Sequence, residues 1–440
     1  MKLTKALSTS ILWRGIYFLS VLLLNVLVAR HFEANGSGQI YYITNLFAFV
    51  LILISLCLEA PMGYYLSQKK LNETQLAFLS LCWAIAIMIP VYLGIHYFSR
   101  LTIAIPFEQR NFEFSASVFL AGNLLITFFV SLFYAKMDYV VPNILLTLVN
   151  LFLIVLVPNN ETVQNIIGDK EYINFYFFGF FMQGFLLAIF FVIKYVKRKD
   201  FLVIPKDIIK PFLNFAFIAV ITNSMTFLMY RIDYWFVNKY CTASDLGNYI
   251  QACKLAQLFF VIPSILAAVV FPMTASGRQV EVNEKMQMLS RGLILAYSIC
   301  CAVLLSIGYW LFPLVFGKTF SSMYWPFFFL VPGILSYSVT HLITAYYSGK
   351  KVLGVNLRSI LIALIIIIIG DIIVIPVFGI KGAAVVSSIG YSCYLSYMMF
   401  VHTREYKSKF SDFLLFRKSD WLLLQKAVVQ AIYSRKQDQL

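Results

Sequence analysis

The chain has 440 residues, of which 61% are hydrophobic and 12% are charged. A soluble domain carries about 25% charged residues, so the composition argues against a water-soluble enzyme and for a polytopic membrane protein. Lys and Arg number 35 against 20 Asp and Glu. In so apolar a chain, we assign this excess to loops beside anionic membrane lipids, with no nucleic acid as a partner.

Apolar runs of about 20 residues recur along the chain, and each is long enough for a helix to cross a bilayer. Long continuous runs favour helices over the short alternating strands of a membrane barrel. We therefore expect an all-α integral membrane protein with about twelve transmembrane helices. The expected spans are residues 9–29, 40–65, 76–98, 115–135, 139–158, 173–195, 212–238, 248–272, 291–316, 325–347, 355–377 and 380–402.

The first apolar run follows Lys2 and Lys5 and has no convincing small-residue cleavage site after it. This pattern is typical of an uncleaved first span rather than a signal peptide. Most Lys and Arg residues fall in the segments on the same side as the N-terminus. The positive-inside rule then predicts that both chain ends face the cytoplasm.

A basic link over residues 199–211 divides the spans into two halves of six, residues 1–198 and 212–402. The halves share a weak pattern of a basic residue, a glycine, a tyrosine and, after an apolar run, a proline. The pattern comprises Arg30, Gly38, Tyr41 and Pro61 in the first half, and Lys239, Gly247, Tyr249 and Pro272 in the second. We interpret it either as two parallel repeats or as chance similarity between glycine-rich turns.

Residues 403–440 form a basic tail after the last span. Trp421, Leu424, Val428 and Ile432 recur at helical spacing, with Lys and Arg on the other faces. Such a segment either lies on the inner leaflet as an amphipathic helix or is partly disordered.

The sequence contains no motif of a nucleotide-binding loop, a serine hydrolase or a zinc protease. Its seven cysteines show no CxxC pair and no spacing typical of a metal site, so we expect small apolar side chains and no disulfide. We predict no catalytic residues, no metal and no cofactor.

Three basic residues lie within or near apolar spans: Arg14, Arg231 and Lys254. Arg231 and Lys254 are predicted at about the same depth, roughly 10 Å below the outer surface. A charge at such a position costs about 2.5–3.5 kcal/mol on insertion scales. These residues either line a route for an anionic headgroup such as pyrophosphate, or they pair between helices and reach toward the interface.

Three carboxylates also lie within spans: Asp233, Glu59 and Asp371. Asp233 is a candidate for ion coupling or a charge partner that neutralises Arg231 or Lys254. Glu59 and Asp371 either bind a coupling H⁺ or Na⁺, or they are helix-end carboxylates at a wet boundary. Polar residues in mid-span either line a cavity or join helices, and the cavity candidates are Asn25, Asn223, Gln251 and Gln257.

Two segments carry a family resemblance. One runs from Asp233 through Gly247 and Tyr249 to Pro272, and the other is IPVFGIKGAA, beginning at Ile375. Together with the LVARHFEANGSGQIYY and LEAPMGYYLS segments, they resemble the bacterial O-antigen and polysaccharide flippases. This family belongs to the MOP superfamily, with the MATE exporters and the lipid II flippase. The resemblance covers about residues 5–402, and the chain has room for two spans fewer than the lipid II flippase.

The resemblance implies two six-helix lobes that form a V around a central cavity. It implies flipping of an oligosaccharide linked to undecaprenyl pyrophosphate across the bacterial inner membrane by alternating access, coupled to H⁺ or Na⁺. Polysaccharide polymerase machinery would then be a partner. The alternatives are a MATE-like exporter of small cations, whose cavity should be acidic, and a membrane polymerase or glycosyltransferase, which should carry a larger outer loop.

Overall fold

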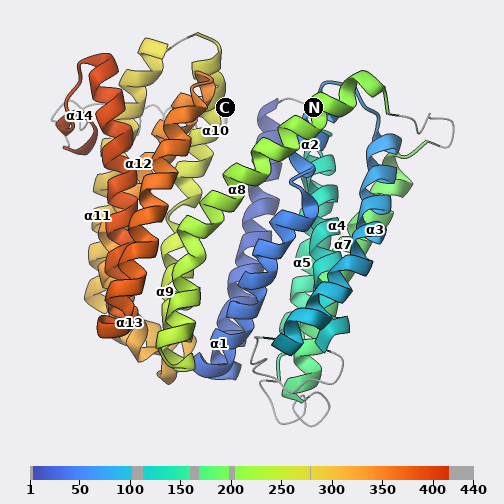
Figure 1. Ribbon diagram of the computed structural model, residues 1–440, viewed down its shortest axis with the longest axis horizontal. Helices are drawn as coiled ribbons and strands as arrows, with labels where there is room; N and C mark the ends of the chain where they lie inside the picture. The colour runs from blue at the N-terminus through green and yellow to red at the C-terminus, as the bar shows by residue number, and fades with distance from the viewer. Residues whose placement is uncertain (1–2, 102–111, 159–167, 198–203, 278, 416–440) are drawn as a thin grey trace, which may run out of the picture. The chain divides into compact units, whose positions relative to one another are not determined.

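The computed structural model describes residues 3–101, 112–158, 168–197, 204–277 and 279–415, and these contain helices and no strand (Figure 1). Within the described residues, the chain begins with the helices α1 (Leu3–Ser55), α2 (Glu59–Ser67), α3 (Glu73–Leu101), α4 (Phe112–Ala135), α5 (Val140–Val155), α7 (Asp169–Tyr195), α8 (Lys206–Tyr240) and α9 (Ala243–Leu258). They are followed by α10 (Val261–Ala275), α11 (Gln279–Phe316), the 3₁₀ helix η1 (Lys318–Met323), α12 (Tyr324–Gly349), α13 (Leu353–Tyr406) and α14 (Ser411–Leu414).

Helix α1 turns back on itself. Its 53 residues would span about 80 Å if straight, far more than a bilayer core. The helix breaks at Glu33, whose φ is 54° and ψ is −174°. The Tyr41 hydroxyl donates to the Asn25 carbonyl at 2.9 Å, although the two residues are 16 apart in sequence. The two arms therefore lie side by side (Figure 1), as the separate first and second spans predict.

Helix α13 reverses in the same way at Gly379, whose positive φ of 57° suits a residue without a Cβ. Its two arms pack so closely that a Cβ added at Gly390 would lie 2.4 Å from Ile367. A Cβ at Gly370 would lie 2.6 Å from Val386. The predicted boundary between the last two spans, at residues 377–380, is thus confirmed.

Eight of the described helices are long and apolar enough to cross a membrane, and α9 with α10 forms a ninth span bent by 41°. The second arms of α1 and α13 and the shorter apolar helix α5 account for the rest of the twelve expected spans. The all-α membrane architecture is therefore confirmed.

Two expected spans are broken rather than continuous. The span over residues 40–65 stops at Ser55 and resumes at Glu59, and the span over residues 248–272 breaks at Phe259 and Phe260. Pro61 and Pro263 each occupy the third position of the second helix in their pair. A proline lacks an N–H and clashes with the carbonyl four residues earlier, at Cys57 or Phe259, so each break lies where its proline requires it.

The chain divides into two compact units. The first contains residues 1–224 and 315–317, and the second contains residues 225–314 and 318–440. The boundary within α8 lies downstream of the expected linker, of which residues 206–211 are already helical. The amphipathic tail that we predicted from Trp421 onward lies outside the described residues.

Small and polar residues hold the first unit together. A Cβ at Gly122 of α4 would lie 2.4 Å from the backbone of Phe181 in α7, so these helices meet at van der Waals distance. The Gln183 amide donates to Asn150 at 2.8 Å, and the Asn150 amide donates to Ser20 at 3.0 Å. This chain of hydrogen bonds joins α7, α5 and α1.

Candidate functional site

A short turn places Arg231, Asp233 and Lys254 at a similar height in the second unit. Helix α8 ends at Tyr240 and α9 begins at Ala243, so the chain reverses between them. A capping box fixes the turn, because the Thr242 hydroxyl accepts from the Asp245 N–H while the Asp245 carboxylate accepts from Thr242. Residues at equal distances from this turn therefore lie opposite each other.

The Arg231 guanidinium is held by neutral groups. Its Nη1 donates to the Tyr234 hydroxyl at 2.9 Å, and its Nη2 donates to Gln257 Oε1 at 2.7 Å. The guanidinium also lies over the Tyr234 ring, 5.2 Å from its centre. Within the described residues, no ion pair joins Arg231 to a carboxylate. Asp233 still attracts Arg231 electrostatically, although the two side chains form no direct ion pair.

Lys254 lies near Arg231, and the positive charge of Arg231 disfavours a second positive charge on Lys254. Both side chains are only partly exposed. Two like charges that lie close together raise the free energy of the protein, and an anion placed near both would lower it. The structure thus brings together the two cations that the sequence placed at one depth.

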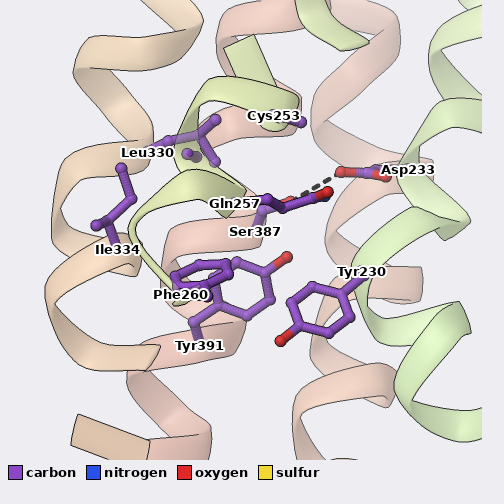
Figure 2. A pocket seen from close by; sticks show the side chains of 10 residues that line it. Tyr230, Asp233, Cys253, Gln257, Phe260, Leu330, Ile334, Ser387 and Tyr391 are labelled. Carbon is purple, nitrogen blue, oxygen red and sulfur yellow. Dashed lines mark hydrogen bonds between the residues drawn. The ribbon is translucent and has the colours of Figure 1, made fainter. Parts of the chain in front are cut away.

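The Asp233 carboxylate is buried, at 2% exposure, and is also held by neutral donors. Its Oδ1 accepts from the Tyr234 N–H at 2.9 Å. Its Oδ2 accepts from the Tyr249 hydroxyl at 2.5 Å and from the Ser387 hydroxyl at 3.1 Å. Figure 2 shows this carboxylate facing the end of Gln257 and Ser387 across a small cavity. The cavity has a volume of about 10 Å³, room for about one water molecule.

Asp371, on the first arm of α13, is fully buried. Neither of its carboxylate oxygens has a partner among the described residues. Its charge repels that of Asp233. A buried carboxylate without a partner is costly unless it is protonated or binds a cation. Of the predicted carboxylates, Asp371 therefore has the clearest unused capacity to bind a cation.

The predicted cavity residues of the second unit divide into two kinds. Gln257 is the acceptor for Arg231. Gln251 is buried, and its Oε1 has no hydrogen-bond partner among the described residues. Sequence reasoning missed the contributions of Tyr234, Tyr249 and Ser387. The spacing of three residues between Arg231 and Tyr234 in a helix could have indicated that contact, but no local signal links Ser387 to Asp233.

The candidates in the first unit have simpler surroundings. Arg14 is exposed and lies over the Tyr134 ring, 5.3 Å from its centre. Glu59 opens α2, and its buried Oε2 has no hydrogen-bond partner among the described residues. Asn223 donates to Cys57 Sγ at 3.3 Å across the break between α1 and α2.

Asn25 donates to the Val21 carbonyl of its own helix at 2.8 Å. This bond satisfies a side-chain donor locally. It gives no evidence for the predicted cavity role of Asn25, which stays a prediction.

Comparison of the sequence with protein-family models gives no match, and comparison with curated proteins gives no significant match. Solved structures do match. The lipid II flippase MurJ in an inward closed conformation aligns with a TM-score of 0.69 at 16% identity, covering 97% of this chain and 99% of that chain. A multidrug resistance MATE family transporter of the MOP superfamily, in an outward-facing conformation, aligns with a TM-score of 0.61 at 15% identity, covering 92% and 96%.

A MOP superfamily transporter from Pyrococcus furiosus, described as having a binding pocket of reverse polarity, aligns with a TM-score of 0.58 at 14% identity. It covers 91% of this chain and 95% of that chain. At these identities the likeness establishes the fold: this chain has the fold of MOP transporters and flippases along almost its whole length. These structural neighbours are described as transporters and flippases.

Proposed function

We propose that this protein is a flippase for a lipid-linked oligosaccharide and that its cargo carries a pyrophosphate headgroup on undecaprenol. This proposal rests mainly on the contacts that Arg231 makes with its neighbours. Its guanidinium is bonded to neutral Tyr234 and Gln257, and Lys254 adds a second positive charge nearby. The fold adds support, because one structural neighbour is a flippase of a lipid-linked substrate, lipid II.

The physical reason is the cost of moving phosphate charges through a medium of low dielectric constant. An unpaired ion transferred from water into a protein interior loses several kcal/mol of solvation even after relaxation. Arginine and lysine on the route offset this loss with charge-assisted hydrogen bonds. The hydrogen bonds of Arg231 go to neutral groups, and Asp233 attracts the guanidinium without a direct ion pair, so Arg231 can still form an ion pair with an anion. Arg14 is a further proposed contact for the headgroup, from the first unit.

We assign coupling to the carboxylates. Asp233 and Asp371 repel each other, and Asp371 lacks any hydrogen bond among the described residues, so an added H⁺ or Na⁺ would relieve the pair. Glu59, with one oxygen unpartnered, is the corresponding candidate in the first unit. The proposed transport mode is alternating access, in which the cation and the lipid-linked anion bias the same conformational equilibrium.

The proposed setting is the bacterial inner membrane, with both chain ends in the cytoplasm and with polysaccharide polymerase machinery using the product on the outer side. The positive-inside pattern of Lys and Arg supports this orientation. The described helices support a multi-pass membrane protein.

A second candidate function, export of small organic cations, is favoured by one observation. Asp371 is a buried carboxylate with both oxygens unpartnered among the described residues, and such a group attracts cations. Several structural neighbours are MATE transporters. We place this function second because Arg231 and Lys254 would repel a cationic cargo from the same region.

The test is transport by the purified protein in liposomes. Three fluorescent cargoes are compared: a polyprenyl pyrophosphate oligosaccharide, the same glycan on a neutral lipid, and a cationic dye. The proposal expects the first cargo alone to become accessible on the opposite leaflet faster than in empty liposomes. Transport of the dye without transport of the pyrophosphate lipid would establish the second candidate instead.

A further inference from the structure

Helices α11, α12 and α13 line an open apolar groove in the second unit that shares no residue with the small cavity beside Asp233. The groove has a volume of about 490 Å³. It is lined by apolar side chains such as Leu305, Phe328 and Pro332 together with small residues of α13. The neighbouring residues 387 and 388 divide the two sites, since Ser387 contacts Asp233 and Ser388 lines the groove.

The groove exists because α13 carries small side chains along one face. Ser388, Ser392 and Ser396 recur every four residues and lie one above another, with Cys393 beside them. Their hydroxyl groups are already engaged. Ser388 donates to the Phe329 carbonyl at 2.6 Å, Ser392 bonds Ser336 at 3.0 Å, and Ser396 donates to the Ser392 carbonyl at 2.8 Å. The wall therefore offers a ligand almost no unsatisfied polar group.

All three helices are long and apolar enough to cross a membrane, and large apolar side chains at the groove are exposed. Phe328 is 42% exposed and Ile389 is 49% exposed. A depression of this kind within a bilayer is in contact with hydrocarbon. Water in the groove would lack hydrogen-bond partners, and an unfilled groove would lose dispersion contacts with its lining, so occupation by an apolar group is favoured.

We propose that this groove binds one acyl chain of a bilayer phospholipid. Even if each methylene group is given about 30 Å³, the volume of a water molecule in the liquid, a groove of about 490 Å³ has room for at least about sixteen methylene groups. That is the length of an ordinary acyl chain, whereas the polyprenyl chain of the proposed cargo is several times larger. The bound chain packs against the faces of α12 and α13 opposite Leu330 and Ser387, and so against the back of the charged site. This proposal requires a membrane protein but does not require the proposed cargo.

The first test fills the groove. Cys393→Phe adds a large side chain inside it without removing a hydrogen bond given by the structure, and Cys300→Phe, at an exposed position of α11 outside the groove, is the matched control. Native mass spectrometry of each protein, released from phospholipid micelles, counts retained lipids. We expect the wild type and Cys300→Phe to keep about one phospholipid more per chain than Cys393→Phe. Equal retention by all three proteins would overturn the proposal.

The second test uses the unmodified protein, so it does not depend on the folding of a variant. The wild type is reconstituted with a phospholipid whose acyl chain carries a photoreactive diazirine, and labelled peptides are mapped after illumination. We expect labelling of residues 385–396 to exceed that of the exposed α11 residues Ile299 and Val303 by severalfold. Uniform labelling, or displacement of the label by a polyprenyl lipid at equal concentration, would show that the groove does not select a phospholipid chain.

Discussion

Charged residues at the ends of the helices and charged residues inside the second unit have different partners. At the ends, charges are neutralised by opposite charges: Lys136 pairs with Glu73, and Lys194 pairs with Asp138 at 2.7 Å. Inside the second unit, Arg231 is bonded to two neutral groups. The helix-end pairs can therefore be explained by their contribution to the structure, whereas ion pairing does not explain the presence of Arg231.

In the second unit, the same contrast between helix-end and internal charges holds for a carboxylate. Lys350 and Glu405 pair at the end where α12 and α13 meet the surface. Asp371, farther along the same helix α13, has neither an opposite charge nor a hydrogen bond among the described residues. An internal charge that is left without a neutralising partner costs stability. We propose that a ligand supplies the missing partner of these internal charges, and the following experiments test this proposal.

The largest effect is expected from removal of both internal cations. Arg231→Ala combined with Lys254→Ala removes at least two charge-assisted hydrogen bonds to the proposed pyrophosphate, worth about 1.5–3 kcal/mol each. The flipping rate in liposomes at low cargo concentration should fall by about a hundredfold or more.

The control for that variant is the helix-end substitution Lys136→Ala combined with Lys194→Ala, which removes the same total charge. Its flipping rate should stay within about twofold of the wild type, because exposed pairs contribute little. If the two double variants lose activity to the same extent, the contrast between internal and helix-end charges has no functional meaning.

The second effect concerns Asp371. Asp371→Asn keeps the shape of the side chain and removes the buried charge, so the protein should be as stable as the wild type or more stable in thermal unfolding, while transport loses its response to an imposed H⁺ or Na⁺ gradient. Glu59→Gln in the first unit is the matched variant. Retention of the gradient response in Asp371→Asn and its loss in Glu59→Gln would move the coupling site to the first unit.

The smallest effect is expected at a helix end. Lys350→Met breaks the pair with Glu405, and the free energy of unfolding should fall by about 0.5–1 kcal/mol because the pair is partly exposed to solvent. The flipping rate should not change. The free energy of unfolding is measured by chemical unfolding in detergent. A loss several times larger would show that the Lys350–Glu405 pair contributes more than an ordinary surface ion pair.

Much of the architecture could be predicted from the sequence, because apolar runs of bilayer length are compatible with few structures other than membrane-spanning helices. The reversal at Gly379 and the meeting of Arg231 with Lys254 both follow from counting residues between turns. The reversal of α1 was expected between residues 29 and 40, but its exact position at Glu33 was not predictable, because Gly36 and Gly38 indicated a turn nearby and the structure keeps both in helix.

The breaks at Pro61 and Pro263 could have been predicted from the i−4 clash, yet the repeat pattern paired Pro61 with Pro272 instead. Pro272 lies inside the continuous helix α10. The position of a proline relative to a helix start decides whether it breaks the helix, and spacing from a glycine does not reveal that position.

The charged site was predictable only in part. The sequence identified each ionisable residue, since charges in apolar spans are conspicuous. It did not identify Tyr249 and Ser387 as the groups that hold Asp233, because Ser387 is 154 residues away along the chain and carries no local signal. Contacts between distant spans depend on helix packing, which the apolar periodicity of a membrane helix does not specify.

The most direct test of the central claim is binding of a short-chain polyprenyl pyrophosphate to the purified protein, measured by calorimetric titration in detergent. The wild type and Lys136→Gln should bind with the same affinity, and Arg231→Gln should bind at least tenfold more weakly. Equal affinities for all three proteins, or no binding to the wild type, would contradict the claim that the internal cations receive a phosphate.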